Sequence, residues 1–520
     1  MNQHRDAPEH PRYDCIVVGA GTAGVIVAAR LAEDGRRRVL LLEAGDARID
    51  AEPPEALSMA GFPVLDGYNW PFVASARESG IGSAVTVPYP MAKTLGGGSA
   101  INGSVAMHAR RGDYDRWAAL GNDRWRWEHV HPWLSEVDRI AHGDAPRRGA
   151  AHAAVTALQD GFIAACVARG FAIVDMADSD RAGVGAIPHN ARDGRRRSTA
   201  ELYLRDAPLR ANLVVRSNCE VRRLILASGS GRIRASGVEV GTTRGIEVFE
   251  GAHIVLCAGA IGSPTVLARS GIGPPDALEQ AGMPIRLALA GVGQGLQDHP
   301  VVSLWARTQA DRPTLGESLH QGVLQCSSDG SDAAYDLQVF ALAGIRTAHL
   351  PGLSELVGDG SVCGLSSVVA APDSLGRLEF SQRDGALVPR IVLNLLDSDD
   401  DLRKMKAGVR LAWDLSRHAP LDALMGRPIS CSQRVIDSDP MLERMLRVTV
   451  RASWHPVGTL RMGPARDEMA VADDLGLVHG CDNVSVADAS LMPVIPRVPT
   501  NLGCMVIGER IAAHLRERVG

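Results

Sequence analysis

The stretch DCIVVGAGTAGVIVAARLAEDGRRRVLLLEAGD, residues 14–46, determines the fold that we expect for this chain. A short apolar run enters the spacing G-x-G-x-x-G at Gly19, Gly21 and Gly24. A helical pattern follows, and a second apolar run ends in Glu43. Strand, glycine turn, helix and strand in this order are typical of the first unit of a dinucleotide-binding domain.

Each residue of this motif has a chemical reason. Gly19 permits the tight turn, Gly21 lets the backbone approach a pyrophosphate, and Gly24 lets helix and strand pack closely. The free N–H groups of the helix N-terminus attract the phosphate. Glu43 is placed to accept hydrogen bonds from an adenosine ribose and would repel the 2′-phosphate of NADP. The motif fits NAD and FAD equally, because both contain ADP.

The amino-acid composition excludes several classes of protein and partner. The chain has 520 residues, of which 45 % are hydrophobic and 22 % charged, as in globular proteins of two or three domains. A net charge of -5 argues against nucleic acid as a partner. Nine dispersed cysteines without a C-x-x-C pair indicate free thiols and no metal site. With no apolar run long enough for a membrane span and a polar first segment, we expect a cytoplasmic protein.

Two further segments are long enough to suggest a family. They are AKTLGGGSAINGSVAMHARRGDYDRW (92–117) and GAIGSPTVLARSGIG (259–273). Both resemble the two long signatures of the glucose-methanol-choline (GMC) family of flavoprotein oxidoreductases. Additional blocks that resemble the family lie at 291–300, 455–463, 482–493 and 499–512. The blocks follow the family's order over nearly the whole chain.

The resemblance implies an α/β (α+β) fold with two domains. One is a Rossmann-like FAD-binding domain, and the other is a substrate-binding domain on a mainly antiparallel sheet. We expect the discontinuous FAD-binding domain to comprise 12–134, 191–304 and 446–520. The substrate-binding domain would then comprise 135–190 and 305–445.

The resemblance also implies which residues bind FAD. The residues expected to hold the ADP half are Gly19, Gly21, Gly24 and Glu43, and Val221 is expected near the adenine. The residues expected along the ribityl chain, pyrophosphate or flavin are Gly97, Gly98, Asn102 and Asp488. Glycines in the 96–98 loop would let the backbone lie against a planar ring. Some family members tether flavin through a histidine where this chain has Ile101, so we expect FAD to be bound non-covalently.

The implied reaction is oxidation of an alcohol, which needs a base for the hydroxyl proton. His455 matches the family's catalytic base, whereas we expect His108, His299 and His479 to be structural. The family usually supplies a second polar side chain 44 residues later, and here that position is Pro499, which has no donor. Asn501 is the alternative, but it matches a family asparagine at the start of the last helix, so we expect it to face the cofactor.

A site without the second donor favours alcohols that are easy to oxidise. We therefore expect a small primary alcohol such as an aromatic hydroxymethyl group, pyridoxine included; pyridoxine 4-oxidase-type members similarly pair histidine with proline. The electron acceptor, oxygen or another molecule, stays open. The alternatives are a choline-dehydrogenase-like enzyme with a non-oxygen acceptor and a non-redox enzyme of the hydroxynitrile lyase type. An NAD-dependent dehydrogenase conflicts with the loop at 96–102.

Three other features complete the expectations. The basic run 195–197 is typical of a solvated surface. Trp454 could line the pocket or belong to the core. The last helix should begin near Thr500 and Asn501 and point its positive N-terminus toward the active-site loop, where it would stabilise negative charge on reduced flavin by about 0.3–2 kcal/mol. An ordinary terminal packing helix fits the sequence equally well.

Overall fold

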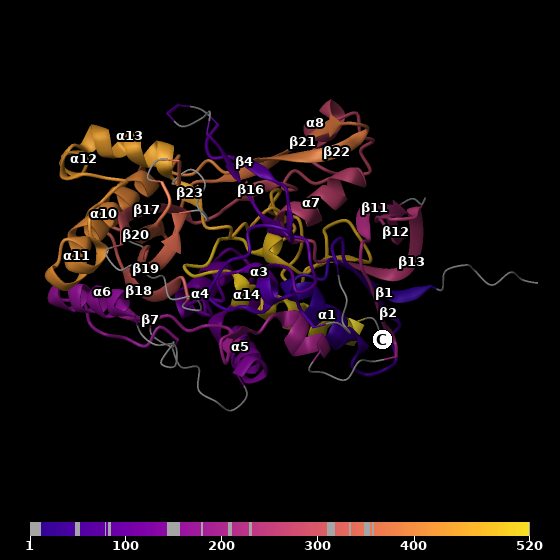
Figure 1. The fold of residues 1–520 in the computed structure, drawn as a ribbon. Coiled ribbons are helices and arrows are strands. Elements are labelled where there is room, and N and C mark those ends of the chain that lie inside the picture. The colour runs from indigo at the N-terminus through magenta and orange to yellow at the C-terminus, as the bar shows by residue number, and fades with distance from the viewer. Residues whose placement is uncertain are drawn as a thin grey trace, which may run out of the picture.

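The computed structural model describes most of the chain. The described residues are 12–46, 52–78, 80–81, 85–142, 156–177, 180–205, 211–227, 231–308, 318–331, 334–347, 354–355 and 358–518. Within these ranges, no helix has the length and apolar composition needed to cross a bilayer. Two large sheets organise the molecule, and helices cover both (Figure 1).

The first sheet is the expected nucleotide-binding sheet. Five of its strands pair in parallel, in the order β10 (Leu213–Arg216), β2 (Val39–Leu42), β1 (Tyr13–Val18), β13 (Gly245–Leu256) and β24 (Val484–Val486). The first half of β13 pairs instead with a meander of β12 (Ala235–Thr242) and β11 (Glu220–Leu226). β2 is buried throughout, as expected for a strand covered on both faces.

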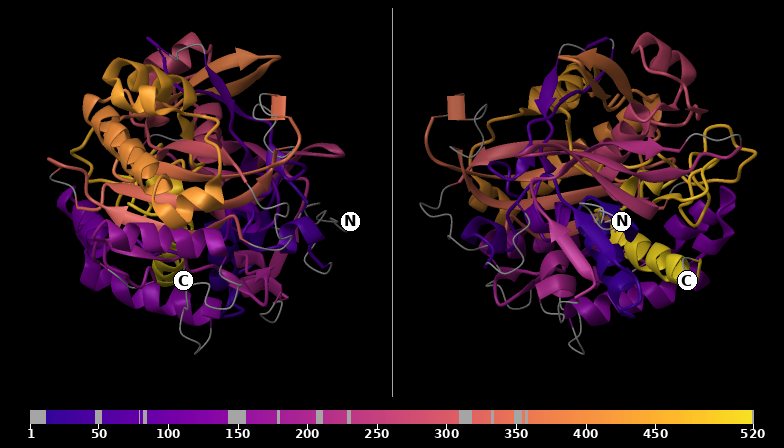
Figure 2. Two further views of the ribbon diagram at one scale, coloured as in Figure 1. Left: turned by 60° about the vertical axis from the view of Figure 1, so that its left-hand side comes forward. Right: turned by 90° about the vertical axis from the view of Figure 1, so that its right-hand side faces the viewer.

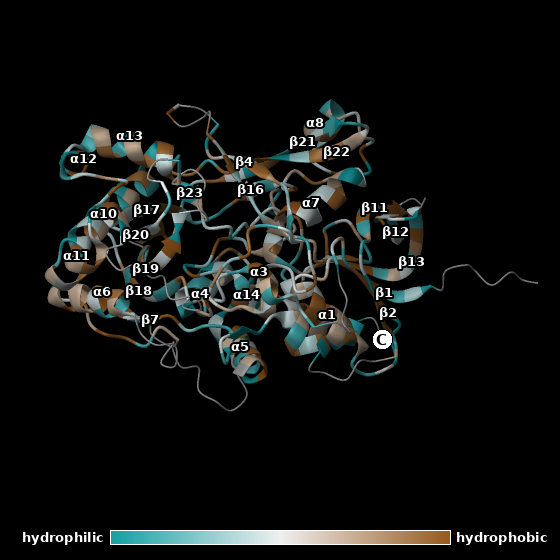
Figure 3. Cartoon of the chain, in the orientation of Figure 1, coloured by the Kyte–Doolittle hydropathy of each residue, from teal (hydrophilic) through white to brown (hydrophobic). Residues whose placement is uncertain are grey.

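Helices α1 (Thr22–Ala32) and α14 (Asn501–Arg518) pack against each other at this sheet. Their close approach depends on Gly508, where a Cβ would lie 3.1 Å from the backbone oxygen of Ala23. Figure 3 shows hydrophobic residues on α1 and β13, which form part of this core. The two ends of the chain therefore meet at the nucleotide-binding sheet, and the last helix begins at Asn501 as predicted.

The second sheet is antiparallel throughout, which confirms the expected substrate-domain architecture. Its order is β23 (Arg451–Ala452), β17 (Pro300–Arg307), β20 (Ser361–Val369), β19 (Leu337–Arg346), β18 (His320–Cys326) and β7 (Gly183–Ala186). Helices α10 (Asp399–Ser416) and α6 (Ala157–Ala168) pack on it (Figure 2). The predicted domain boundaries stay predictions: β17 spans the one at 304/305 and pairs with β23 beyond the one at 445/446.

A third sheet has the order β16 (Gln294–Leu296), β21 (Gly376–Arg383), β22 (Ala386–Val392), β4 (Val73–Ser75) and β5 (Thr86–Pro88). The shorter elements are α2 (Glu55–Ser58), β3 (Asn69–Trp70), β6 (Met91–Ala92), α3 (Gly98–Ile101), α4 (Arg111–Ala119), η1 (Asp123–Trp125), α5 (Trp127–His142), β8 (Ala191–Arg192), β9 (Arg195–Arg196), η2 (Glu201–Arg205), α7 (Gly259–Arg269), β14 (Ile272–Gly273), α8 (Pro275–Gln280), β15 (Leu287–Ala288), α11 (Ala419–Met425), α12 (Gln433–Asp437), α13 (Asp439–Thr449) and η4 (Ala489–Leu491).

Candidate active site

Four of the sequence motifs meet at one edge of the parallel sheet. Gly19 follows β1, Glu43 follows β2, Gly259 begins α7 just after β13, and Asp488 lies just after β24. Because these strands are parallel, their carboxyl ends lie at the same edge, where open α/β sheets bind their ligands. Segments more than 400 residues apart in the chain are thus brought to one place.

The glycines of this edge are required by backbone approach. A Cβ on Gly24 would lie 1.9 Å from the carbonyl oxygen of Gly19, so no larger residue fits. A Cβ on Gly97 would lie 2.5 Å from the Cα of Gly21. The 96–98 loop therefore lies directly against the N-terminus of α1. This contact joins the two segments predicted to hold the two halves of FAD.

Glu43 is buried, and its carboxylate accepts hydrogen bonds from the backbone N–H groups of Ala20 (2.9 Å) and Gly45 (2.8 Å). Burial raises the pKa of Glu43 to about 7, against the effect of these bonds. The backbone N–H of Cys219 donates to the carbonyl of Glu43 at 2.8 Å. Val221 is buried and lies two residues after Cys219, near the start of β11. The residue predicted to lie near adenine is therefore close to the predicted ribose ligand, Glu43.

Asp488 is buried and accepts four hydrogen bonds from the chain itself. Its donors are the N–H of Gly259 (2.8 Å), the hydroxyl of Ser263 (2.5 Å), and both the N–H and the hydroxyl of Ser490. Burial raises the pKa of Asp488, and these bonds oppose that shift. Asp488 therefore fixes the first turn of α7 at the sheet edge.

The two predicted cofactor asparagines differ in their partners. Asn501 accepts a hydrogen bond from the Thr22 hydroxyl at 3.3 Å, while its buried Nδ2 has no partner among the described residues. The Oδ1 of Asn102 accepts from Arg196 Nη1 (2.7 Å) and from the N–H of Ser104 (2.9 Å). A buried amide donor without a partner next to a glycine cradle is what a polar, planar ligand would complete. These residues fit FAD.

The basic run at 195–197 was expected to be a solvated surface, and for Arg196 this expectation is wrong. Arg195 is exposed, but Arg196 is only 1 % exposed. Backbone carbonyls and Asn102 surround its guanidinium. Composition cannot separate one buried arginine from its solvated neighbours, because the acceptors that bury it come from other parts of the chain.

The centre of the predicted catalytic site is a pair of imidazoles. The Nδ1 atoms of His455 and His299 lie 3.0 Å apart, and the rings meet edge to face at 82°. His299 Nε2 lies 2.9 Å from the carbonyl oxygen of Pro496. A carbonyl only accepts, so His299 carries its proton on Nε2, and in a neutral ring its Nδ1 must accept. His455 therefore carries its proton on Nδ1, and its Nε2 has a free lone pair.

Both rings are neutral near neutral pH. Burial lowers the pKa of His455 well below its usual value, and repulsion from His299 and His320, when these rings are protonated, lowers it further. Burial also lowers the pKa of His299 to about 4, although the carbonyls of Pro496 and Ala370 oppose the shift. We expected His299 to be structural; it is buried, and it contacts the predicted base directly.

Asp298 holds the backbone of the predicted base. Its Oδ1 accepts the N–H of His455 at 3.0 Å, and its Oδ2 accepts the hydroxyl of Tyr89 at 2.5 Å. Burial raises the pKa of Asp298 to about 7, against the effect of its hydrogen bonds. Sequence reasoning missed Asp298 and Tyr89. The adjacency of Asp298 to His299 was the available signal, but nothing in it identified the long-range partners.

The segments next to His455 are held in special conformations. Trp454 has φ 62°, a region that bulky residues rarely adopt, and is 37 % exposed, so it is not a core residue. The loop before α14 is fixed by Arg497, whose Nε donates to Asp113 at 2.7 Å and whose carbonyl accepts from Gln338 at 3.0 Å. Pro499 follows in this loop and is half-buried.

His320 is a further polar residue that the sequence did not single out. It begins β18, and its Nδ1 is buried without a hydrogen-bond partner in the part of the chain that the structure describes. A Cβ on Gly103, directly after Asn102, would lie 3.3 Å from its ring. His320 therefore lies at the end of the predicted flavin loop, and its charge also affects the pKa of His455. Two of the remaining histidines have simple structural partners: His108 contacts Asp138 (2.8 Å), and His479 contacts the carbonyl of Gly463 (3.0 Å).

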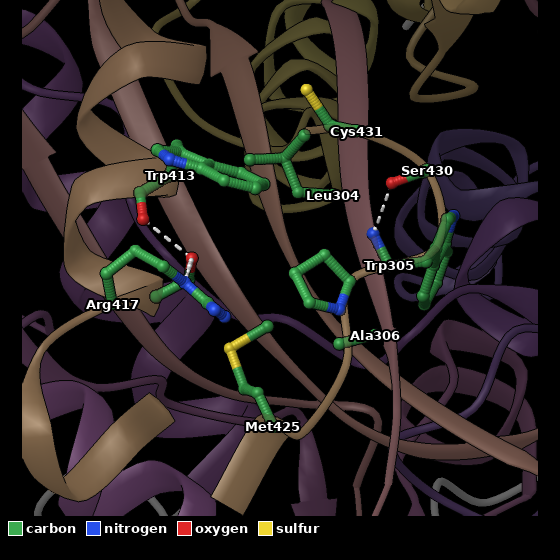
Figure 4. Close-up of a pocket in the computed structure, with 10 residues that line it drawn as sticks. Leu304, Trp305, Ala306, Trp413, Arg417, Met425, Ser430 and Cys431 are labelled. Atoms are coloured by element: carbon green, nitrogen blue, oxygen red, sulfur yellow. Dashed lines mark hydrogen bonds between the residues drawn. The ribbon is translucent and has the colours of Figure 1, made fainter. Parts of the chain in front are cut away.

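A small pocket, open to solvent, lies elsewhere, between β17, α10 and the segment after α11 (Figure 4). Its lining includes Trp305, Trp413, Arg417 and Met425. Trp305 is six residues beyond His299 on an extended strand, which places it about 20 Å away. The guanidinium of Arg417 packs over the ring of Trp413. This pocket is separate from the imidazole pair.

Comparison with known proteins agrees with this geometry. Two profiles, both described as GMC oxidoreductase, match residues 13–301 and 372–508. The 5-(hydroxymethyl)furfural oxidase of a Methylovorus species is 32 % identical, with 96 % of this chain and 98 % of that protein covered. The oxygen-dependent choline dehydrogenase of Photobacterium profundum is 30 % identical, with 96 % and 92 % covered.

Among solved structures, pyridoxine 4-oxidase from Mesorbium loti superposes with a TM-score of 0.84 at 26 % identity, covering 97 % of this chain and 99 % of that one. The two profiles include the parallel sheet and the motifs that meet at the site, and the alignments with these three relatives cover 96 % or 97 % of the chain. The chain therefore belongs to the GMC oxidoreductase family and is an FAD-dependent alcohol oxidoreductase.

Proposed function

We propose that the enzyme oxidises a primary alcohol on an aromatic or heteroaromatic ring to the aldehyde, with His455 as the base. The observation that carries this proposal is the hydrogen-bond chain from Pro496 through His299 to His455. It supports a neutral imidazole with the lone pair of its Nε2 free to accept a proton. The names of the relatives that act on hydroxymethylfurfural and pyridoxine support the substrate class.

In this mechanism the alcohol donates its hydroxyl hydrogen bond to Nε2 of His455. The proton moves to Nε2 as the carbon loses hydride, and FAD, when bound, supplies the hydride acceptor. His299 keeps the ring of His455 oriented, because its Nδ1 accepts the other ring proton. Asp298 fixes the backbone on which the ring is mounted.

Pro499 supports the restriction to activated alcohols. A proline at this position offers no hydrogen bond to the alcohol oxygen, so the site has one fewer group to stabilise developing negative charge. Oxidation next to an aromatic ring needs less of this help, because the product carbonyl is conjugated with the ring. The start of α14 at Asn501, with its contact to Thr22 of α1, supports assigning Asn501 to the cofactor instead.

Two further properties belong to this proposal. FAD is bound non-covalently, since Ile101 in α3 has no nucleophilic atom, and acid precipitation should release all of the flavin into the supernatant. The nine cysteines are all free thiols, which supports a reducing compartment, the cytoplasm.

The test is anaerobic stopped-flow reduction by benzyl alcohol, furfuryl alcohol and pyridoxine, with choline for comparison. His455→Ala should slow flavin reduction by at least about 10²-fold while FAD stays bound. His479→Ala is the matched control and should keep the wild-type rate, because the ring of His479 contacts the backbone carbonyl of Gly463, away from the imidazole pair. An unchanged rate in His455→Ala would remove His455 from the mechanism. Faster turnover of choline would reject the substrate class.

The same experiment separates the alternatives. Bleaching of the flavin by an alcohol without air identifies redox chemistry, and its absence indicates a lyase. Admitting air then distinguishes an oxidase from a dehydrogenase. Because the pKa of His455 lies well below 6.5, the decline of activity on acidification should occur below pH 6.5.

A further inference from the structure

The buried guanidinium of Arg196 contacts the flavin loop at Asn102, and the mechanism above does not use it. Its Nε donates to the carbonyl of Leu57 (3.1 Å), and its Nη2 donates to those of Met59 (3.1 Å) and Phe62 (2.8 Å). Its Nη1 donates to the backbone oxygen of Asn102 and to the side-chain Oδ1 at 2.7 Å. Every acceptor is a neutral oxygen.

No carboxylate among the described residues lies within 4.0 Å of this guanidinium. Glu201 acts on it only through its charge, and the carboxylate of Glu201 is bonded to the N–H of Ser198 (2.9 Å). Burial lowers the pKa of Arg196 to about 10, so it remains a cation at neutral pH. Burying a cation without a counterion costs folding free energy, so the buried charge of Arg196 calls for a functional explanation.

We propose that Arg196 is a positioning residue whose charge, acting through the side chain of Asn102, stabilises negative charge on the bound flavin. The Oδ1 of Asn102 accepts from both Arg196 and the N–H of Ser104 (2.9 Å). These two bonds fix the orientation of the amide and polarise it, so that its Nδ2 becomes a stronger donor. The inference rests on FAD lying along the 97–102 loop, as proposed above.

The position of the charge supports this role. All the N–H groups of Arg196 are directed at the chain, so it acts on a ligand by its field and through Asn102. Inside a protein such a field is screened much less than in water. Negative charge develops on flavin when it is reduced, and also when sulfite adds its electron pair to N5 of the oxidised ring. Both processes should therefore depend on the charge of Arg196.

A purely structural role predicts a different result, because Arg196 also ties 57–62 to the flavin loop. Arg196→Lys keeps the charge but loses the forked geometry, whereas Arg196→Gln keeps hydrogen bonding and loses the charge. Arg195→Gln removes a neighbouring charge whose side chain is 61 % exposed, and serves as the matched control.

The experiment is a sulfite titration of the oxidised holoenzyme, followed by measurement of the flavin midpoint potential. We expect Arg196→Gln to weaken sulfite binding at least about tenfold and to lower the potential, with about 30 mV for each tenfold change in a two-electron couple. Arg196→Lys and Arg195→Gln should stay within about threefold of wild type at neutral pH. Wild-type values in Arg196→Gln, or equal losses in the Lys and Gln variants, would overturn the proposal.

If Arg196→Gln is recovered without FAD, Arg196→Lys decides the question by itself. A buried lysine loses its charge as pH rises, whereas Arg196, with a pKa of about 10, stays charged up to about pH 9. The ratio of the sulfite dissociation constants of this variant and wild type should rise between about pH 6 and pH 9, and a constant ratio would overturn the proposal. The titration needs no alcohol and no base, so its failure is distinct from a failure of the proposed oxidation.

Discussion

The cofactor edge and the imidazole pair are built in different ways. At the cofactor edge the decisive contacts are between backbones: Gly24 lies against Gly19, and Gly97 lies against Gly21. At the imidazole pair they are between side chains, with His299 and His455 separated by 156 residues along the chain. The close contacts of the cofactor edge are possible because its glycines have no Cβ atoms. The contact between the two imidazoles depends on which ring nitrogen of each histidine carries the proton.

Because of this difference, substitutions in the two regions should affect different properties of the enzyme. A substitution at the cofactor edge acts through steric exclusion, whose cost is large and falls on folding or on FAD binding. A substitution at the imidazole pair leaves the scaffold intact and acts on the rate of chemistry. The expected effects therefore decrease from the first region to the second.

Alanine substitutions at two glycines of the same motif, Gly24 and Gly21, should give the largest effects and test the role of backbone contacts at the cofactor edge. Gly24→Ala should cost at least about 3 kcal/mol of stability, since its Cβ would lie 1.9 Å from a backbone oxygen, and should yield little holoenzyme. At Gly21 the nearest atoms to a Cβ are 3.8 Å away, so Gly21→Ala should fold normally. Thermal unfolding and the ratio of FAD to protein measure both effects.

Gly21→Ala then separates folding from binding. If the pyrophosphate approaches the backbone at Gly21, the added methyl group should weaken FAD binding at least about tenfold without changing the unfolding temperature of the apoprotein. Wild-type FAD affinity in Gly21→Ala would show that the pyrophosphate lies elsewhere, and normal stability of Gly24→Ala would contradict the backbone contact itself.

The same difference explains how much could be predicted from sequence. The parallel sheet and the start of the last helix at Asn501 were predictable, because glycine spacing and helical periodicity encode local backbone geometry, whereas the antiparallel sheet was predicted only from the resemblance to the GMC family. The partners of His455 were not. That His299 contacts it depends on the loop carrying Pro496, which no local pattern connects to β17.

Arg196 and His320 are two further residues whose surroundings could not be predicted from a local sequence pattern. Arg196 lies in a run of three arginines, and the run suggested a solvated face, but only the fold brings the carbonyls of 57–62 around one of them. His320 begins an ordinary strand, and its position near the flavin loop follows from the pairing of β18 with β19. The roles predicted for the cofactor residues and for His455 stay predictions.

At the imidazole pair, His299→Leu should slow flavin reduction about 10- to 100-fold, because it leaves the Nδ1 proton of His455 buried without an acceptor. His299→Asn places an amide oxygen near the lost Nδ1 and should recover most of the rate. The dissociation constant of the alcohol should change little in either variant, which separates positioning from binding. Equal losses in both variants would mean that packing of the ring matters and its acceptor does not.

The buried histidines and the buried carboxyls give opposite pH dependences of stability. The pKa is lowered to about 4 by burial in four histidines, His189, His253, His299 and His320. Between about pH 4.5 and 6.5 the unfolded chain binds protons at these sites that the native protein does not, so stability falls on acidification. The pKa values of Glu43 and Asp298, raised to about 7 by burial, act in the opposite sense.

Burial also lowers the pKa of His455 and raises the pKa values of Asp401 and Asp488. Among the described residues, five such histidines therefore oppose four such carboxyls, so the free energy of unfolding should decrease on acidification across this range, by roughly 1.4 kcal/mol per pH unit for each net proton. His320→Gln should reduce the slope by about one proton, whereas Glu43→Gln should increase it. Denaturant unfolding of the apoprotein at several pH values measures the slope. Stability that rises on acidification would show that the buried carboxyls dominate.

The smallest expected effect concerns Pro499. Pro499→Asn would restore a donor where the family usually has a polar side chain, and should help most with alcohols whose alkoxide is not stabilised by conjugation. The ratio of kcat/KM for an aliphatic alcohol to that for benzyl alcohol should rise about 5- to 10-fold, which corresponds to one added hydrogen bond. Using two substrates on one variant cancels changes in stability or FAD content. An unchanged ratio would place the second active-site position elsewhere, and Asn501→Ala would then have to lower the reduction rate as well as FAD affinity.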